Sequence, residues 1–535
     1  MTDTKKYFDA CVASIAEIVK FDSSLAPAQP SMPFGKGAAD CLAYFLDLAA
    51  SFGFETHNYD NYVGEVIFGE GKEFAVLAHL DVVPAGKGWT KLPFGGEICD
   101  GKLYGRGTMD DKGPAVICLY CLRALKESGF VPKKKIKLIV GCNEECGWAC
   151  IDHYNQCAHM PEEGFTPDAD FPAIFAEKGI LHFETAFPLP DAPFTSLTAG
   201  ERPNMVCDYA AASGVSVRGA EKEGICIHGD TVEARGKSAH ASTPEKGVNA
   251  LGILLSYFAE KDERVKNIYD LLFADKLGLR KIEDETGPLT MSANVARYEN
   301  GTLYITTDIR YPATYTQEQI CEKLNAFGAP YTLLHCQKPL YNDKNGFLVS
   351  TLQKVYCEQT GRTEEAIAIG GGTYARALKN GAGFGPQFPD EPSTIHQKDE
   401  YITLENVQKL LDIYTSAIYE LTKYLFVFFL KNPPLSQNWG KAGLCRAAGR
   451  CFCISPPFLI VSIRFANALR NKPYKFFFMT KFVSRTPRRS TCCFLQTAYP
   501  RLSKKGTAVM EACTVISPVH LCSRASQRAV ATPRR

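Results

Sequence analysis

Long hydrophobic runs are missing from this 535-residue sequence. No uninterrupted apolar stretch reaches the ~20 residues that a helix needs to cross a bilayer, so we predict no membrane-spanning segment. The first residues, MTDTKKYFDACVASIAEIVKF, also lack the apolar core and small-residue cleavage site of a secretion signal. Disulfides are therefore not expected for the 21 cysteines, and we predict a reducing, cytoplasmic setting.

Net charge is almost absent, because the formal charge is only +2. Two compositions produce this balance: residues 426–535 hold 19 basic residues and one acid, Glu511, whereas residues 1–425 hold 41 basic and 57 acidic residues. An acidic body is not expected to bind nucleic acid, and only the basic tail has the charge to do so. The tail lacks a C-x₂-C pair and a persistent apolar period, which favours an appended, poorly ordered segment.

Residues 1–425 alternate strand-like and helix-like patterns, which is typical of an α/β fold. A buried strand over 74–83, a helix over 112–128 and a strand over 135–141 fit a βαβ crossover. Prolines and short alternating strands after about residue 183 predict a second domain inserted into the first. The predicted spans are 1–182 and 342–425 for the first domain, 183–341 for the insertion and 426–535 for the tail.

Several polar motifs suit a metal site. His79 and Asp81 sit two residues apart at a strand end, where both side chains can face the same side. A metal-bound histidine usually donates its second N–H to a carboxylate, although a core histidine bonded to a loop aspartate is the more frequent outcome for this pattern alone. The pair Asp110-Asp111 opens a helix, where either residue could also serve as an N-cap.

The pair Glu144-Glu145 follows the second strand. Neighbouring side chains diverge, so one carboxylate can bind metal while the other stays free as a base. Asp168 and His396 stand in two further short motifs, TPDADFP and TIHQ. Two histidines and three carboxylates are ligands suited to Zn²⁺ or a similar divalent ion.

Eight motifs in order make the sequence recognisable: HLDVVPAGKGW, YGRGTMDDKGP, NEE, TPDADFPAIFAEKG, GKSAHASTP, DIRYP, GGGTYAR and IHQKDEY. Together they resemble the M20 metallopeptidases, and most of all the PepV-type bacterial dipeptidases, from near the N-terminus to about residue 425. The resemblance implies a zinc-peptidase-like α/β catalytic domain with a central mixed sheet, interrupted by an α+β lid domain, and hydrolysis of dipeptides. Two alternatives stay open: an N-acyl amino acid deacylase or desuccinylase on the same site, and a non-catalytic protein that binds through its basic tail.

The resemblance also implies two divalent ions, Zn²⁺ by ligand type, with Mn²⁺ or Co²⁺ as alternatives. It assigns the ligands as Asp110 between the two ions, His79 and Asp168 on one ion, and Glu145 and His396 on the other. It further implies a cis bond between Asp110 and Asp111. Asp81 would orient the first histidine, and Glu144 would be the general base.

In the inserted segment, His240 resembles the lid histidine that stabilises the oxyanion, and Arg310 the arginine that grips the substrate carboxylate. From the residues alone, these are as readily a surface histidine and a strand arginine paired with an acid. Asn204 is expected to line the substrate site. The backbone of Gly370, Gly371 and Gly372 is expected to approach the ligand. We expect a monomer or homodimer that acts on small peptides, without a membrane or nucleic-acid partner.

Overall fold

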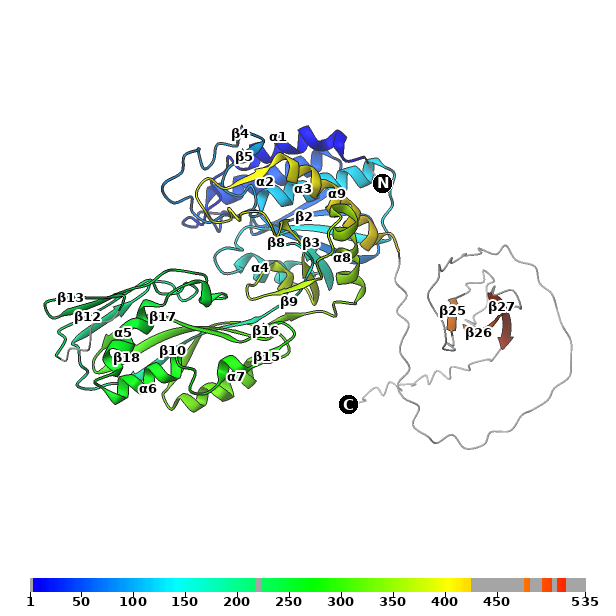
Figure 1. Ribbon diagram of the computed structural model, residues 1–535. Coiled ribbons are helices and arrows are strands. Elements are labelled where there is room, and N and C mark those ends of the chain that lie inside the picture. The colour runs from blue at the N-terminus through cyan, green and yellow to red at the C-terminus, as the bar shows by residue number, and fades with distance from the viewer. Residues whose placement is uncertain (1–2, 217–222, 425–475, 482–492, 503–507, 516–535) are drawn as a thin grey trace, which may run out of the picture. The chain divides into compact units, whose positions relative to one another are not determined.

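The computed structural model describes residues 3–216, 223–424, 476–481, 493–502 and 508–515 (Figure 1). Within residues 3–424 the chain forms two large sheets, and each has its own hydrophobic core. Among all described residues, no helix combines the length and the hydropathy that a bilayer crossing requires.

The first sheet has nine strands and is mixed. They are β1 (Glu55–Tyr59), β2 (Val63–Phe68), β3 (Lys72–His79), β6 (Lys134–Gly141), β7 (Glu163–Thr166), β9 (Ile174–Glu177), β20 (Leu340–Tyr341), β21 (Ile367–Ile369) and β22 (Asn380–Gly383). Strands β6, β3, β7 and β22 form its parallel centre, and antiparallel strands flank both sides. Since β21 and β22 follow the predicted insertion in sequence and still belong to this sheet, the predicted interrupted α/β domain with a mixed sheet is confirmed.

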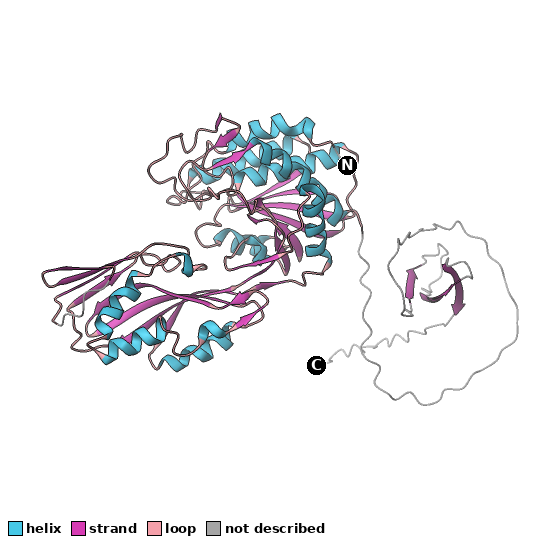
Figure 2. Cartoon of the chain, in the orientation of Figure 1, coloured by secondary structure: helices cyan, strands magenta, loops and turns pink. Residues whose placement is uncertain are grey.

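Helices and short strands complete this domain (Figure 2). The helices are α1 (Phe8–Ile18), α2 (Lys36–Ser51), α3 (Lys112–Glu127), α4 (Ala149–Cys157), α8 (Phe347–Thr360) and α9 (Leu404–Thr422). The short strands are β4 (Glu97–Cys99), β5 (Lys102–Tyr104), β8 (Ala169–Asp170), β23 (Pro386–Gln387) and β24 (Tyr401–Thr403). The apolar faces of all six helices belong to the core of the first sheet, which is why their sequences carry helical apolar stripes.

The predicted βαβ crossover is confirmed, because β3 and β6 pair in parallel and α3 connects them in sequence. The predicted strand over 74–83 is too long at its end, since β3 stops at His79. The neighbouring strand β6 ends at Gly141. The last hydrogen bond between the two strands runs from the Leu80 N–H to the Gly141 oxygen, at 2.8 Å. Leu80 and Val82 are nevertheless buried, so the apolar pattern continues into a buried loop.

The second sheet has eight antiparallel strands, and three helices belong to its core. The strands are β10 (Gly179–Pro188), β11 (Ser196–Ala199), β12 (Tyr209–Ser213), β13 (Ile225–His228), β14 (Thr231–Arg235), β17 (Thr290–Glu299), β18 (Thr302–Tyr311) and β19 (Tyr331–Gln337). The helices are α5 (Ala250–Ala259), α6 (Glu263–Leu272) and α7 (Gln317–Leu324), and a small pair is formed by β15 (Glu283–Asp284) and β16 (Gly287–Pro288). The predicted inserted α+β domain is thus an antiparallel sheet with helices on it (Figure 1).

In the C-terminal tail the structure describes one antiparallel sheet, formed by β25 (Phe476–Lys481), β26 (Cys493–Leu502) and β27 (Ala508–Val515). The remainder of residues 426–535 lies outside the described residues. The sequence-based expectation of a poorly ordered tail therefore stays a prediction.

Candidate metal centre

Five side chains that the sequence singled out lie together at one edge of the first sheet. His79 is the last residue of β3, Glu145 follows β6 and Asp168 follows β7. The carboxyl ends of parallel strands meet at the same edge, which brings these three residues together. Asp110 precedes α3, and His396 lies in the loop between β23 and β24.

Asp110 lies between the two histidines. Its Oδ1 is 3.0 Å from His79 Nε2, and its Oδ2 is 2.8 Å from His396 Nε2. His79 Nε2 is also 3.5 Å from Asp168 Oδ2, and His396 Nε2 is 3.0 Å from Glu145 Oε1. These contacts define two groups of three residues: His79, Asp110 and Asp168, and Asp110, Glu145 and His396. Within each group, one possible ligand atom per residue lies within 4.8 Å of the others. The structure thus forms two clusters able to hold a metal ion, and they share Asp110.

Mutual contacts decide the charge of these groups. Burial opposes ionisation of Asp110, but hydrogen bonds from His396 and His79 lower its pKa below the ordinary value. Burial likewise opposes protonation of His79, yet hydrogen bonds to Asp110 and Asp168 raise its pKa well above the usual range. At His396, burial is again outweighed, and Asp110 and Glu145 raise the pKa to about 11. The carboxylates therefore create a strongly negative surrounding that favours cations.

Asp81 connects the first histidine to the glutamate pair. Its Oδ1 accepts a hydrogen bond from the Glu144 N–H at 2.9 Å, and its Oδ2 accepts one from the Glu145 N–H at 3.1 Å. His79 Nδ1 lies 3.0 Å from the Asp81 backbone oxygen and 3.5 Å from Oδ1 of the same residue. The sequence analysis expected the His79 ring to meet the Asp81 carboxylate, on the assumption that both residues lie in a strand. Because β3 ends at His79, the ring lies closer to the Asp81 backbone carbonyl instead.

Glu144 and Glu145 point to different partners. Glu145 contacts His396, whereas Glu144 Oε1 accepts a hydrogen bond from Trp148 Nε1 at 3.1 Å. Burial raises the pKa of Glu144 well above its usual range, and the negative charges of Asp168 and Glu145 add to this effect against the opposing charge of His79. One glutamate therefore belongs to a ligand cluster, and its neighbour stands beside the cluster.

Asp111 occupies the N-cap position of α3, but its side chain forms no capping hydrogen bond. Its Oδ2 instead accepts a hydrogen bond from the His79 N–H at 3.1 Å, and the residue is completely buried. The Asp110–Asp111 peptide bond is cis, as the resemblance implies.

Glu400 is a residue of the candidate metal centre's surroundings that the sequence analysis did not single out. It is completely buried and forms an ion pair with Arg106 Nη1 at 2.5 Å. Its Oε1 also accepts hydrogen bonds from the N–H groups of Gly107 and Met109, both at 3.0 Å. Burial and the nearby Asp110 raise the pKa of Glu400 to about 7 against the effect of Arg106. This pair fixes the loop that carries Asp110, and the motifs YGRGTMDDKG and QKDEY contain both partners.

Replacing Arg106 with methionine should lower the free energy of unfolding by about 3–5 kcal/mol, because it leaves the Glu400 carboxylate buried without its partner. Lys354→Met is the control, since Lys354 forms an exposed ion pair with Glu358 at 3.7 Å and should cost less than about 1 kcal/mol. Urea denaturation of the three proteins measures both changes. Equal losses in the two variants would contradict the structural role of the buried pair.

The inserted domain meets the first domain at Gly370. A Cβ on this glycine would lie 2.9 Å from the Ser242 Cβ, so only glycine permits the close approach. The Ser242 hydroxyl is 2.7 Å from Nδ1 of His240, whose side chain is exposed. Desolvation, and then the charges of Arg310 and His396, lower the pKa of His240.

Arg310 is buried and already bonded. Its Nε and Nη2 donate to the two carboxylate oxygens of Asp308 at 2.7 and 2.8 Å, and its Nη1 donates to the Gly370 oxygen at 3.1 Å. Asp308 also contacts Nε2 of His182 at 2.8 Å. The strand arginine is thus paired with an acid, as the simpler reading has it, and Asp308 is a second residue that the sequence reading did not single out.

The remaining predicted positions differ in their surroundings. Asn204 is exposed, and its backbone oxygen accepts a hydrogen bond from the Ala241 N–H at 2.9 Å, next to His240. A Cβ on Gly372 would meet the Arg376 guanidinium at 2.9 Å, whereas Gly371 has space. Arg376 forms a buried ion pair with Glu177 at 2.6 Å and donates to the Gly371 oxygen at 2.6 Å, which holds the glycine segment in place.

Comparison with known proteins identifies the family. The model of the family described as Peptidase family M20/M25/M40 matches residues 75–420, which is more than half of the chain. This protein is an M20-family peptidase. The match covers all five residues of the two clusters, and it confirms the family membership expected from the eight motifs.

Individual proteins similar to this chain agree with the family match. YtjP of Bacillus subtilis (strain 168) is 38% identical over 74% of this chain and 93% of its own length. The Beta-Ala-Xaa dipeptidase of Lactobacillus delbrueckii subsp. lactis is 34% identical over 79% of this chain and 98% of its own length. Human carnosine dipeptidase 1 shares the fold, with a TM-score of 0.50 at 14% identity, over 78% of this chain and 97% of the human chain. The expected metal dependence agrees with the family, and the expected likeness to dipeptidases is confirmed by the second relative.

Proposed function

We propose that this M20 peptidase hydrolyses dipeptides with the help of two divalent metal ions. The observation that carries the proposal is the position of Asp110, whose two oxygens each contact a different histidine within two separate ligand clusters. His79 and Asp168 would complete one site, and Glu145 and His396 the other. The nitrogen and carboxylate donors fit Zn²⁺, and Mn²⁺ or Co²⁺ would also be accepted.

When bound, such ions lower the pKa of a water molecule and polarise the peptide carbonyl. The residues of the chain then move protons and hold charge. Glu144 takes the proton of the attacking water and delivers it to the leaving amine. Asp81 keeps Glu144 and Glu145 in place through their backbone N–H groups. His240 stabilises the negative charge that develops on the carbonyl oxygen.

The inserted domain would recognise the ends of the substrate. Arg310 binds the C-terminal carboxylate with its remaining N–H groups, and Asp308 holds the guanidinium in the required orientation. The segment Gly370–Gly372 and Asn204 would line the same site. The dipeptidase name of the Lactobacillus relative supports a substrate of two residues. Closure of a site at both ends favours dipeptides over longer peptides.

Replacing Arg310 with lysine should lower kcat/KM for a dipeptide by about 10–100-fold, since one charge-assisted hydrogen bond contributes about 1.5–3 kcal/mol. A dipeptide with a C-terminal amide should already be poor for the wild type, and the variant should not lower its rate further. Steady-state kinetics with both substrates measures this coupling. Equal wild-type kcat/KM values for the acid and the amide would refute the carboxylate-binding role.

Removal of metal with a chelator should abolish turnover, and addition of Zn²⁺, Mn²⁺ or Co²⁺ should restore it. We would assay the restored enzyme on a panel of dipeptides, together with N-acetyl and N-succinyl amino acids. Preference for dipeptides supports the proposal. Preference for the acylated amino acids would establish a deacylase on the same site, and no turnover with any metal would leave only a binding function.

We further propose that the enzyme works in the cytoplasm as a monomer or homodimer, with small peptides as its partners and no nucleic acid. All fourteen cysteines in residues 3–216 and 223–424 are free thiols, which suits a reducing compartment.

A further inference from the structure

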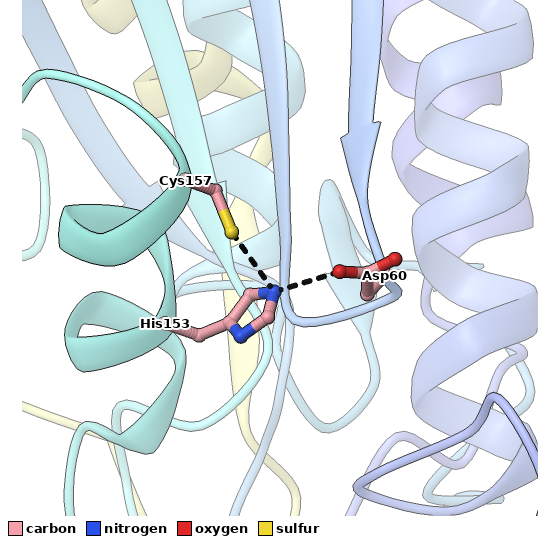
Figure 3. Close-up of side chains that lie close together, drawn as sticks. All are labelled: Asp60, His153 and Cys157. Carbon is pink, nitrogen blue, oxygen red and sulfur yellow. Dashed lines mark hydrogen bonds and ion pairs between the residues drawn. The ribbon is translucent and has the colours of Figure 1, made fainter.

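A third group of possible metal ligands lies outside the proposed catalytic centre. Asp60, His153 and Cys157 point toward one another (Figure 3). His153 and Cys157 lie four residues apart on α4, and Asp60 lies in the turn between β1 and β2. The proposed catalytic mechanism uses none of these three residues.

Both contacts within this group involve the same imidazole nitrogen. His153 Nε2 is 3.0 Å from Asp60 Oδ2 and 3.5 Å from Cys157 Sγ (Figure 3). In a relay that activates a thiol, the histidine would use one nitrogen for the nucleophile and the other for the carboxylate. Here three donor atoms surround one point and lie within 4.8 Å of one another. The arrangement therefore favours a shared ion over a Cys–His–Asp relay.

The surrounding structure holds the donors in place. The ring of His153 stacks on Tyr62, with centroids 4.1 Å apart and an interplanar angle of 18°. Asp60 and Asn61 both have positive φ, 52° and 59°, and the Asn61 side chain donates a hydrogen bond to the Ser31 oxygen at 2.8 Å. The Asp60 side chain is 76% exposed and that of His153 is 22% exposed, so an ion can enter from solvent.

We propose that Asp60, His153 and Cys157 form a separate site for a Zn²⁺-type ion, with water as the remaining ligand. Imidazole nitrogen, thiolate and carboxylate are the donors that Zn²⁺ combines, whereas Mg²⁺ and Ca²⁺ select oxygen. The thiol of Cys157 releases its proton to the solvent on binding, and the sulfur binds as thiolate. The ion ties α4 to the β1–β2 hairpin. Because two of its ligands stand one turn apart on a single helix, the site is largely preformed.

Co²⁺ distinguishes this site from the proposed catalytic pair, because only a thiolate ligand gives an intense near-ultraviolet charge-transfer band. Metal-free full-length protein should be titrated with Co²⁺, and the bound ions should be counted after equilibrium dialysis. We expect Cys157→Ser to lose a distinct part of the band together with one bound ion per chain. His153→Gln should lose the same part of the band.

Two further variants serve as controls. Cys226→Ser replaces an exposed cysteine on β13 and should keep the wild-type band and ion count. Asp110→Ala should retain the part of the band that depends on Cys157, so failure of the catalytic proposal and failure of this one are distinguishable. A Cys157→Ser protein with the same band and the same number of ions as the wild type would overturn the proposal. An unchanged band in His153→Gln would do so as well.

Discussion

Replacing Glu144 with glutamine should reduce kcat for dipeptides by about 10²–10⁴-fold and leave the metal content unchanged. Glutamine keeps the oxygen that accepts the hydrogen bond from Trp148, which lies 3.1 Å away in the wild type. It cannot accept a proton from water or return one to the leaving amine. The variant therefore removes the proposed proton transfer with little change in shape.

Kinetics and elemental analysis should be carried out on the same preparation of the Glu144→Gln protein. Glu70→Gln provides a matched control, because Glu70 is an exposed residue in the turn between β2 and β3 and should leave both quantities unchanged. A loss of kcat smaller than tenfold would mean that another group is the base. Loss of metal would instead make Glu144 a ligand.

Asp110→Ala should remove both metal ions and with them nearly all activity. Each oxygen of Asp110 contacts a different histidine, at 3.0 and 2.8 Å, so the substitution takes one ligand from each cluster. Each ion supplies several kcal/mol of transition-state stabilisation. Since about 1.4 kcal/mol corresponds to a tenfold change in rate, the rate should fall by several decades.

Asp168→Ala is the informative comparison, since Asp168 contacts only His79 of the two histidines and should cost one ion. Asp110→Asn keeps the size of the side chain and separates loss of ligand charge from loss of packing. Circular dichroism verifies that each variant is folded. Two equivalents of tightly bound metal in Asp110→Ala would contradict the shared-ligand assignment.

The sequence predicted the local elements well where one pattern dominated. The helix expected over 112–128 is α3, and the strand expected over 135–141 is β6. These elements bury an apolar stripe or run against one core, so their periodicity is visible in the sequence. The end of β3 was wrong because burial of the following loop preserves the apolar pattern after the hydrogen-bonded ladder has stopped.

The candidate ligands were also accessible from the sequence, because histidine and carboxylate residues followed strands whose ends meet. The sequence did not indicate which buried residues hold the candidate site residues in position. Glu400 lies 294 residues from Arg106, and Asp308 binds the Nε and Nη2 edge of the Arg310 guanidinium. Arg106 and Glu400 become neighbours only on folding, and neither residue alone has a distinctive pattern. Asp308 and Arg310 lie two residues apart on β18, but the sequence does not show that they are buried together as an ion pair.

The sequence by itself determined the types of ligand, the α/β character of the first domain, the presence of an insertion and the family. Residue chemistry and apolar periodicity are local properties, and both can be recognised in the sequence. Only the tertiary structure decided that Asp110 is shared between two clusters, that Arg310 is already held by Asp308, and that the β1–β2 turn approaches α4. The first and third of these facts depend on distances between segments far apart in sequence, and packing of the cores sets such distances. The second depends on the burial of β18, which leaves Arg310 with Asp308 of the same strand as its ion-pair partner.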